Sequence, residues 1–328
     1  MANDQLTWET TDQWNVGVDF GFLKNRINGT VEFYLQNTKD LLLKRQLPVV
    51  SGFSSVMSNV GSTRNKGVEI TLNTRNIMNR NFTWSTDLTF SANKEEIVEL
   101  YNGKTDDVGN LWFIGQPIDV YYNYKKIGIW QNTENDLAEM AKFNEKGANF
   151  KPGSIRLEDV DGDYKITEED KQILGSVRPK FVASMVNNFE FKGFDLSVFL
   201  YASVGGLLRN NIEFMEKPGR GNTVKVDYWT PTNPTNAFPR PSVDVEKLDY
   251  ISTLGYDKAD FLRIRNITLG YTLPEMWSKK VLMDKIRIYL SANNPAIFTN
   301  FTGIDPEGAN GRTAPSYSTW MFGINLSM

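Results

Sequence analysis

Apolar and polar residues alternate along residues 14–22, whose sequence is WNVGVDFGF. One side holds Trp14, Val16, Val18, Phe20 and Phe22, and the other holds Asn15, Gly17, Asp19 and Gly21. Successive side chains of a β-strand point to opposite faces, so this pattern predicts a strand with one oily and one polar face. A tilted strand needs about ten residues to cross a bilayer, which is close to the length of this block.

The same alternation returns in six later blocks, which begin near residues 27, 68, 82, 194, 286 and 320. The apolar rows of all seven blocks contain no charged residue. The facing rows hold Asp19, Glu32, Glu69, Asp87, Asp195 and Arg287. A lysine or arginine on the lipid face near mid-membrane costs roughly 2–4 kcal/mol. The sorting therefore predicts that the oily rows face lipid and the polar rows face a lumen.

Two further blocks are less regular. Residues 181–191 carry Asn187 in the apolar row, and residues 261–273 carry Arg263 and Arg265 in line with Ile267 and Leu269. We expect these two arginines to lie above the hydrocarbon, at the outer rim of a barrel.

The connections between nine such strands alternate between short and long. The short ones are residues 23–26, 76–81, 192–193 and 274–285, and the long ones are about 38–65, 93–180, 205–260 and 295–318. Outer-membrane barrels have short periplasmic turns and long external loops. The pattern thus predicts an all-β fold, an antiparallel transmembrane β-barrel with long extracellular loops. Nine strands cannot close with every neighbour antiparallel, and an unpaired edge in lipid is costly. We therefore expect residues 1–328 to be the C-terminal segment of a barrel whose earlier strands lie N-terminal to it.

The external loop at residues 93–180 is too long to be plain coil. We expect a hairpin formed by residues 120–130 and 154–160, and a short helix near residues 134–144. Leu137, Met140 and Ala141 would form the buried stripe of that helix.

Composition excludes several classes of protein. The formal net charge is −3 without a basic block, which argues against a nucleic-acid binder. The chain has no cysteine and no histidine, so disulfides, thiolate or imidazole metal ligands and a Ser-His-Asp triad are all excluded. No run approaches the roughly 20 apolar residues of a membrane helix, and the first residues lack a basic-then-apolar signal segment.

The sharpest local motif is DVDGDYKITEED at residues 159–170. Asp159, Asp161, Asp163 and Asp170 occupy positions 1, 3, 5 and 12 of an EF-hand calcium loop, and Lys165 can offer its carbonyl at position 7. Position 6 departs from the pattern, because Tyr164 stands where a glycine makes the sharp turn, and position 12 is aspartate rather than glutamate. The motif predicts a structural Ca²⁺ clamp on an external loop; the alternative is a solvated acidic turn.

Aromatic residues in the expected external loops are candidates for ligand contact, because rings can stack on sugar faces. They are Tyr121, Tyr122, Tyr124, Trp130, Tyr228, Trp229 and Tyr256. Contact with another protein that covers these loops and packing within the loops are equally open alternatives. Trp14, Trp84 and Trp320 are instead expected in the interfacial girdles of the barrel.

Several motifs occur in an order that resembles the SusC/RagA family of TonB-dependent outer-membrane transporters of Bacteroidetes. They are LTWETT at 6–11 with GVDF at 17–20, NVGS at 59–62 followed by NKGVE at 65–69, PG at 152–153, FDLS at 194–197, FLRIRNITLGY at 261–271 and GIDPE at 303–307. Pro295 departs from the family pattern, and we expect it to end its strand early.

The resemblance implies a plugged barrel of about 22 strands in the bacterial outer membrane. Members import oligosaccharides, peptides or similar nutrients, are driven by the TonB complex through the plug, and work beneath a SusD-like surface lipoprotein. The plug and the early strands are not in this sequence. The preferred function is therefore the barrel of an active importer. A β-rich glycan-binding surface module with structural calcium is the alternative, and a polysaccharide hydrolase is disfavoured because adjacent carboxylates such as Glu95 and Glu96 point apart.

Overall fold

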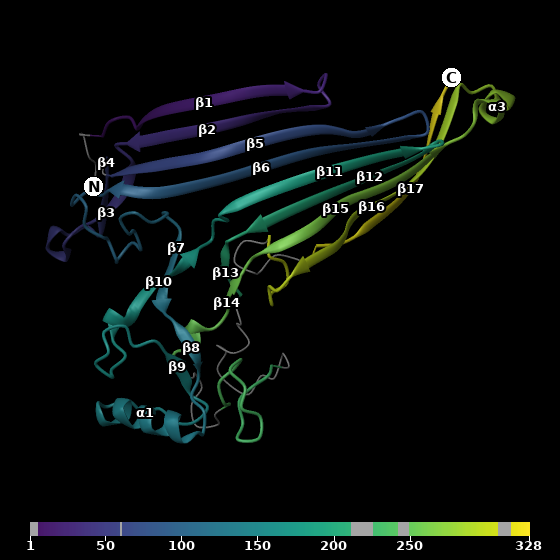
Figure 1. The fold of residues 1–328 in the computed structure, drawn as a ribbon. Coiled ribbons are helices and arrows are strands. Elements are labelled where there is room, and N and C mark those ends of the chain that lie inside the picture. The colour runs from purple at the N-terminus through teal and green to yellow at the C-terminus, as the bar shows by residue number, and fades with distance from the viewer. Residues whose placement is uncertain (1–5, 60, 211–225, 242–248, 308–315) are drawn as a thin grey trace.

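The computed structural model describes residues 6–59, 61–210, 226–241, 249–307 and 316–328. Within these residues the main feature is a nine-stranded antiparallel sheet whose strands pair in chain order (Figure 1). Its strands are β1 (Thr10–Phe22), β2 (Ile27–Lys39), β5 (Ser62–Met78), β6 (Phe82–Glu99), β11 (Phe181–Phe191), β12 (Phe194–Val204), β15 (Phe261–Thr272), β16 (Lys285–Thr299) and β17 (Thr319–Ser327). The nine predicted spanning strands are confirmed. The sheet is curved but not closed, and its short turns lie at the end opposite to the long loops (Figure 1).

Cross-strand register aligns the oily side chains into continuous rows. One row crosses eight strands through Val18, Val31, Ile70, Phe90, Ala183, Ala202, Leu262 and Phe298. The adjacent row on the opposite face runs through Asp19, Thr30, Thr71, Thr89, Ser184, Tyr201 and Arg263. Paired residues share a face of a sheet, so each face keeps one chemical character from strand to strand. The oily rows do not pack into a core: Val18 is 61% exposed and Phe298 59%.

A β-bulge corrects the expected position of Arg263. Between β12 and β15 the register shifts, because Phe199 pairs with Asn266 while Leu200 pairs with Ile264. Arg265 is the extra residue, and each residue before it changes face relative to a regular strand. Ile264 therefore joins the oily row, and Arg263 pairs with Tyr201 on the polar face. The expectation that Arg263 lies in line with Ile267 was wrong, because period-2 counting cannot detect an inserted residue.

Pro295 does not end its strand. β16 continues through it to Thr299, and the ladder with β15 skips from Asn293 to Ala296. Asn294, inside this irregularity, has a φ of 49°. A proline at a bulge does not have to donate a ladder hydrogen bond, so the strand continues past it. Asn187 does lie in an oily row, where its Oδ1 accepts from Trp84 Nε1 at 3.0 Å and from Thr86 Oγ1 at 2.7 Å.

The long loops fold into an external cap with its own strands and helices (Figure 1). Four two-stranded ladders occur there, β3 (Leu42–Gln46) with β4 (Ser55–Asn59), β7 (Val120–Tyr124) with β10 (Lys171–Ser176), β8 (Lys126–Ile129) with β9 (Ile155–Leu157), and β13 (Leu207–Arg209) with β14 (Tyr256–Lys258). The described part of this region also holds the helix α1 (Glu134–Glu145) and the short helices η1 (Val49–Ser51), η2 (Glu168–Asp170) and η3 (Ile251–Thr253). Helix α3 (Glu275–Ser278) with η4 (Lys279–Val281) lies in the β15–β16 turn. The single hairpin predicted in loop 93–180 is in fact two ladders, because β7 pairs with β10 rather than with the segment near residue 155.

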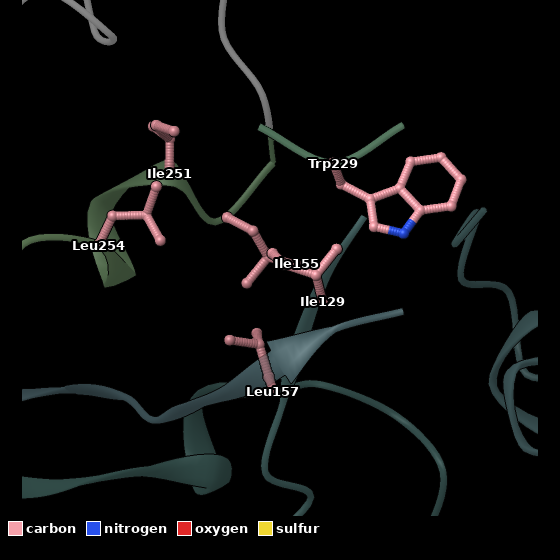
Figure 2. Packing of buried hydrophobic residues seen from close by; sticks show 6 residues of the cluster. All are labelled: Ile129, Ile155, Leu157, Trp229, Ile251 and Leu254. Atoms are coloured by element: carbon pink, nitrogen blue, oxygen red, sulfur yellow. The ribbon is translucent and has the colours of Figure 1, made fainter. Parts of the chain in front are cut away.

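The cap contains the hydrophobic core that the spanning sheet lacks. Ile129, Ile155, Leu157, Trp229, Ile251 and Leu254 form one buried cluster, which joins segments far apart in the sequence (Figure 2). A second cluster consists of Trp130, Met140, Phe143 and Phe150. Helix α1 was predicted, but its buried stripe is Met140 and Phe143. Leu137 and Ala141 are exposed instead, because Phe143 turns the packed face of α1 toward Trp130.

Candidate metal-binding loop and external cap

The acidic loop at residues 159–170 lies between β9 and β10, ends in η2, and places three carboxylates together. One oxygen from each of Asp159, Asp161 and Asp170 lies within 4.8 Å of the other two. Asp163, the fourth predicted carboxylate, is outside this group, and its Oδ1 accepts the backbone N–H of Lys165 at 2.7 Å. Ca²⁺ is bound in proteins by clustered hard oxygens of this kind, so the arrangement suits the predicted ion.

Backbone N–H groups hold the loop in its shape. Asp170 is 1% exposed, and its two oxygens accept the N–H groups of Val160 at 2.8 Å and Thr167 at 2.7 Å. Asp159 accepts the N–H groups of Gly162 at 2.8 Å and Tyr164 at 2.9 Å. Because a carboxylate oxygen has two lone pairs, these bonds leave acceptor capacity for a cation.

Tyr164 takes the turn conformation that EF-hand loops assign to glycine. Its φ is 64°, in the left-handed region that costs a side-chain-bearing residue roughly 1–2 kcal/mol. The ring contacts Phe143 edge-on at 5.5 Å, and Lys142 Nζ lies 5.0 Å from its centroid. Packing against α1 thus accounts for an aromatic residue at position 6.

Crowding of negative charge affects the titration of this loop. The backbone N–H of Asp163 stabilises the charged form of Asp161, but burial and the charges of Asp163 and Asp170 outweigh it and raise the pKa of Asp161. A bound cation would relieve the same repulsion.

The two predicted ligand-binding tryptophans are buried in the cap. Trp130 is 1% exposed and lies under the Arg156 guanidinium, whose carbon is 4.4 Å from the ring centroid. Trp229 is also buried, and its Nε1 donates to Gln131 Oε1 at 2.8 Å. Neither ring presents a free face for stacking on a sugar, so packing within the loops is the role this structure gives them.

The predicted tyrosines mostly contact other rings. Tyr121 meets Tyr256 edge-on at 5.2 Å, and Tyr122 lies 4.8 Å from Phe113. Burial and the nearby Glu168 carboxylate raise the pKa of Tyr124 to about 12. Tyr228 is the most open of the set and lines a hollow with Asp227 and Asn233.

A cavity of about 630 Å³ in the cap brings together residues that the sequence did not single out. Tyr256 is the one predicted aromatic residue in its lining, which includes Lys125, Lys126 and Phe238. Burial lowers the pKa of Lys126, against the opposing charge of Asp257. Lys126 Nζ donates to the carbonyls of Asn236 and Ala237 at 2.7 and 2.8 Å. Nothing in the local sequence distinguishes this lysine from the other surface lysines.

Arg263 attaches the last long loop to the polar face of the sheet. Its guanidinium is 2% exposed, donates to Asp305 Oδ1 at 2.8 Å and Ser316 Oγ at 2.8 Å, and lies 2.7 Å from Glu307 Oε2. Burial would raise the pKa of Asp305, but the Glu307 N–H, Ser316 and Arg263 hold it below its ordinary value. The FLRIR and GIDPE motifs are therefore two halves of one ion-pair network.

Antiparallel strands with one oily face, short turns at one end and a folded cap at the other define the wall of an outer-membrane β-barrel. Residues 1–295 match the family described as TonB dependent receptor-like, beta-barrel, and the chain belongs to this family. It is a SusC/RagA-like member of it, and proteins of this kind reside in the outer membrane. Among the described residues, no helix is both long and apolar enough to cross a membrane.

Known relatives align over almost the whole chain. TonB-dependent receptor P3 of Formosa agariphila is 32% identical over 99% of this chain and 35% of its own length. TonB-dependent receptor SusC of Bacteroides thetaiotaomicron is 30% identical over 99% of this chain and 32% of its own. The solved structure of the RagAB peptide transporter superposes with a TM-score of 0.78 at 26% identity, over 99% of this chain and 36% of that one. The chain thus spans about a third of the length of the relatives it matches.

Proposed function

We propose that this chain forms the C-terminal wall and external cap of a TonB-dependent importer. The observation that supports this most strongly is the register, which keeps lipid-compatible rows on one face of the sheet and polar rows on the other. The chain spans about a third of the length of its relatives, and the remaining barrel strands and a plug would lie outside these residues. The proposal gives the chain no catalytic role.

The cargo class we propose is short peptides or oligosaccharides, taken up beneath a SusD-like surface lipoprotein. Similarity to the RagAB peptide transporter favours peptides. Within the cap, the cavity lined by Lys125, Lys126 and Tyr256 is the best placed for polar cargo, because it combines cations with apolar walls. Tyr228 is the second candidate for contact with cargo or with the lipoprotein, since its side chain is exposed to solvent.

Uptake in cells tests this proposal. A strain lacking the gene is complemented with the complete protein, and the uptake of fluorescently labelled peptide and oligosaccharide mixtures is compared. We expect one mixture to be imported, and import to stop when TonB is removed. A Lys126→Gln variant of the complete protein should change which cargo is imported, while the amount of protein at the cell surface stays the same. Import that continues without TonB would contradict the proposal.

We also propose that the acidic loop holds Ca²⁺ as a structural clamp, through Asp159, Asp161, Asp163, Asp170 and the carbonyl of Lys165. The three clustered carboxylates support it. The alternative is an acidic turn that needs no ion. Terbium luminescence sensitised by Tyr164, displaced by Ca²⁺, is a direct readout in the intact protein. We expect Asp161→Asn to abolish the signal and Glu145→Gln, an exposed carboxylate on α1, to leave it unchanged. Equal luminescence in both variants would favour the ion-free turn.

A further inference from the structure

The cap cavity of about 630 Å³ holds two charges of opposite sign that do not neutralise each other. The charged residues in its described lining are Lys125, Lys126 and Asp257. Lys125 Nζ lies 3.1 Å from Glu158 Oε2, so the charge of Lys125 is already balanced. Among the residues that the structure describes, neither Lys126 on β8 nor Asp257 on β14 makes an ion pair. The cavity therefore presents one ammonium group and one carboxylate group to a ligand.

Both groups have hydrogen-bonding capacity that the protein does not use. Lys126 Nζ donates to the carbonyls of Asn236 and Ala237 at 2.7 and 2.8 Å, and an ammonium group has a third donor. Asp257 Oδ2 accepts the hydroxyl of Thr302, which leaves acceptor capacity on both carboxylate oxygens. Burial lowers the pKa of Lys126 and outweighs the charge of Asp257. A carboxylate bound beside Lys126 would stabilise its charged form.

Apolar side chains form much of the remaining lining. They are Ile173 and Leu174 of β10, Leu207 of β13, Phe238 and Leu254. The volume lies within the range of about 300–1,000 Å³ that is usual for small-molecule sites. The cavity is therefore suited to a small ligand that carries a positive group, a negative group and apolar substituents.

We propose that this cavity binds short linear peptides by their two free ends, with the α-carboxylate at Lys126 and the α-ammonium at Asp257. This binding mode rests on the proposed importer function and narrows its cargo to peptides with unblocked ends. A neutral oligosaccharide would displace water from both charged groups without providing a counter-charge, which is costly. An inorganic anion would match Lys126 alone. A peptide with free ends provides both charges, and its side chains can contact the apolar walls.

Calorimetric titration of the complete protein in detergent tests this binding mode without transport. The probes are trileucine, its N-acetylated form and its C-amidated form. Loss of a charged hydrogen bond weakens binding about tenfold or more, so each blocked peptide should bind the unaltered protein about tenfold more weakly. Asp257→Asn should bind free and N-acetylated trileucine equally and still discriminate against the amide. Lys126→Gln should bind free and amidated trileucine equally and still discriminate against the acetylated form.

The two variants are chosen to keep the internal hydrogen bonds of the cap. An asparagine side chain retains an acceptor for Thr302, and a glutamine side chain retains amide donors for the two carbonyls that Lys126 contacts. Matched controls are Glu145→Gln and Lys146→Gln, which remove the same charges at the exposed end of α1. Both controls should bind all three peptides like the unaltered protein.

Equal affinity of the unaltered protein for the three peptides, or no binding of trileucine, would overturn the proposal. So would a variant that weakens all three peptides equally, because that result indicates a structural role only. Binding of maltotriose that either variant weakens would give the cavity to sugars instead. The importer function is tested separately: TonB-dependent uptake together with equal peptide affinities would refute this binding mode alone. TonB-independent uptake together with the selective pattern would refute the importer function and leave the binding mode standing.

Discussion

Arginine scanning of neighbouring positions on β5 gives the sharpest prediction about the wall. Ile70 lies in the oily row with Val31 and Phe90, whereas Thr71 pairs with Thr30 and Thr89 on the polar face. On this face of β5 the oily residues Val68, Ile70 and Leu72 lie between Lys66 and Thr74. Ile70 is four residues from each of these two polar residues, which is roughly 10 Å along the membrane normal for a tilted strand. This position is close to the middle of the bilayer.

An arginine near mid-membrane on the lipid face costs about 2–4 kcal/mol, and a polar-face substitution with no special contact is within about 0.5 kcal/mol of neutral. Because about 1.4 kcal/mol is a factor of ten, Ile70→Arg should lower the folded-to-unfolded ratio about 30-fold or more, and Thr71→Arg should change it little. Chemical unfolding of the complete protein in liposomes, followed by tryptophan fluorescence, measures both. Equal destabilisation by the two variants would refute the assignment of faces.

Three further predictions concern the cap and the last loop. Arg263→Ala removes the ion-pair partner of the buried Asp305 carboxylate and should destabilise the attachment of the last loop by about 3–5 kcal/mol. Arg265→Ala, at a more exposed ion pair with Glu307, should cost about 1 kcal/mol or less; protease sensitivity of that loop reports both changes. Trp130→Ala should destabilise the cap by about 3–5 kcal/mol and Tyr228→Ala by little, measured by thermal unfolding of the cap in each variant. Tyr124, whose pKa is raised to about 12, should favour the folded cap fully below pH 10, and that contribution should be lost as pH rises from 10 to 12. Tyr124→Phe should remove this loss, and an unchanged alkaline unfolding profile would contradict it.

The spanning strands could be predicted because the membrane leaves a simple record in the sequence. Each strand must keep its polar residues away from lipid. The alternation of apolar and polar residues is therefore visible in the sequence, although the overall composition is ordinary. The predicted face of Arg263 was wrong because of the bulge at Arg265. An inserted residue leaves the composition unchanged but moves Arg263 to the other face of the sheet.

The cap was predicted less well for a different physical reason. Its strands are three to six residues long, and such segments carry too few residues to specify a partner. The β7–β10 ladder joins residues about 50 apart, which local patterns cannot reveal. For Trp130 and Trp229 the sequence left ligand contact and loop packing equally open, because burial of loop residues depends on tertiary packing such as that of Trp229 in Figure 2. The acidic loop was the exception: its spacing alone predicted four carboxylate ligands, and the fold brings three of them together, Asp159, Asp161 and Asp170.

Spin-label accessibility along β5 tests the central claim most directly. Because this chain has no cysteine, single cysteines placed at successive positions from Val68 to Asn73 are its only labelling sites. Any cysteine elsewhere in the complete protein is first replaced by serine, and the labelled protein is studied in liposomes. Labels at Val68, Ile70 and Leu72 should collide mainly with oxygen dissolved in the lipid, and labels at Glu69, Thr71 and Asn73 with a water-soluble nickel complex. A period of two between the two reagents is the predicted result. Oily positions shielded from both reagents would place those side chains in a packed protein core and contradict the barrel.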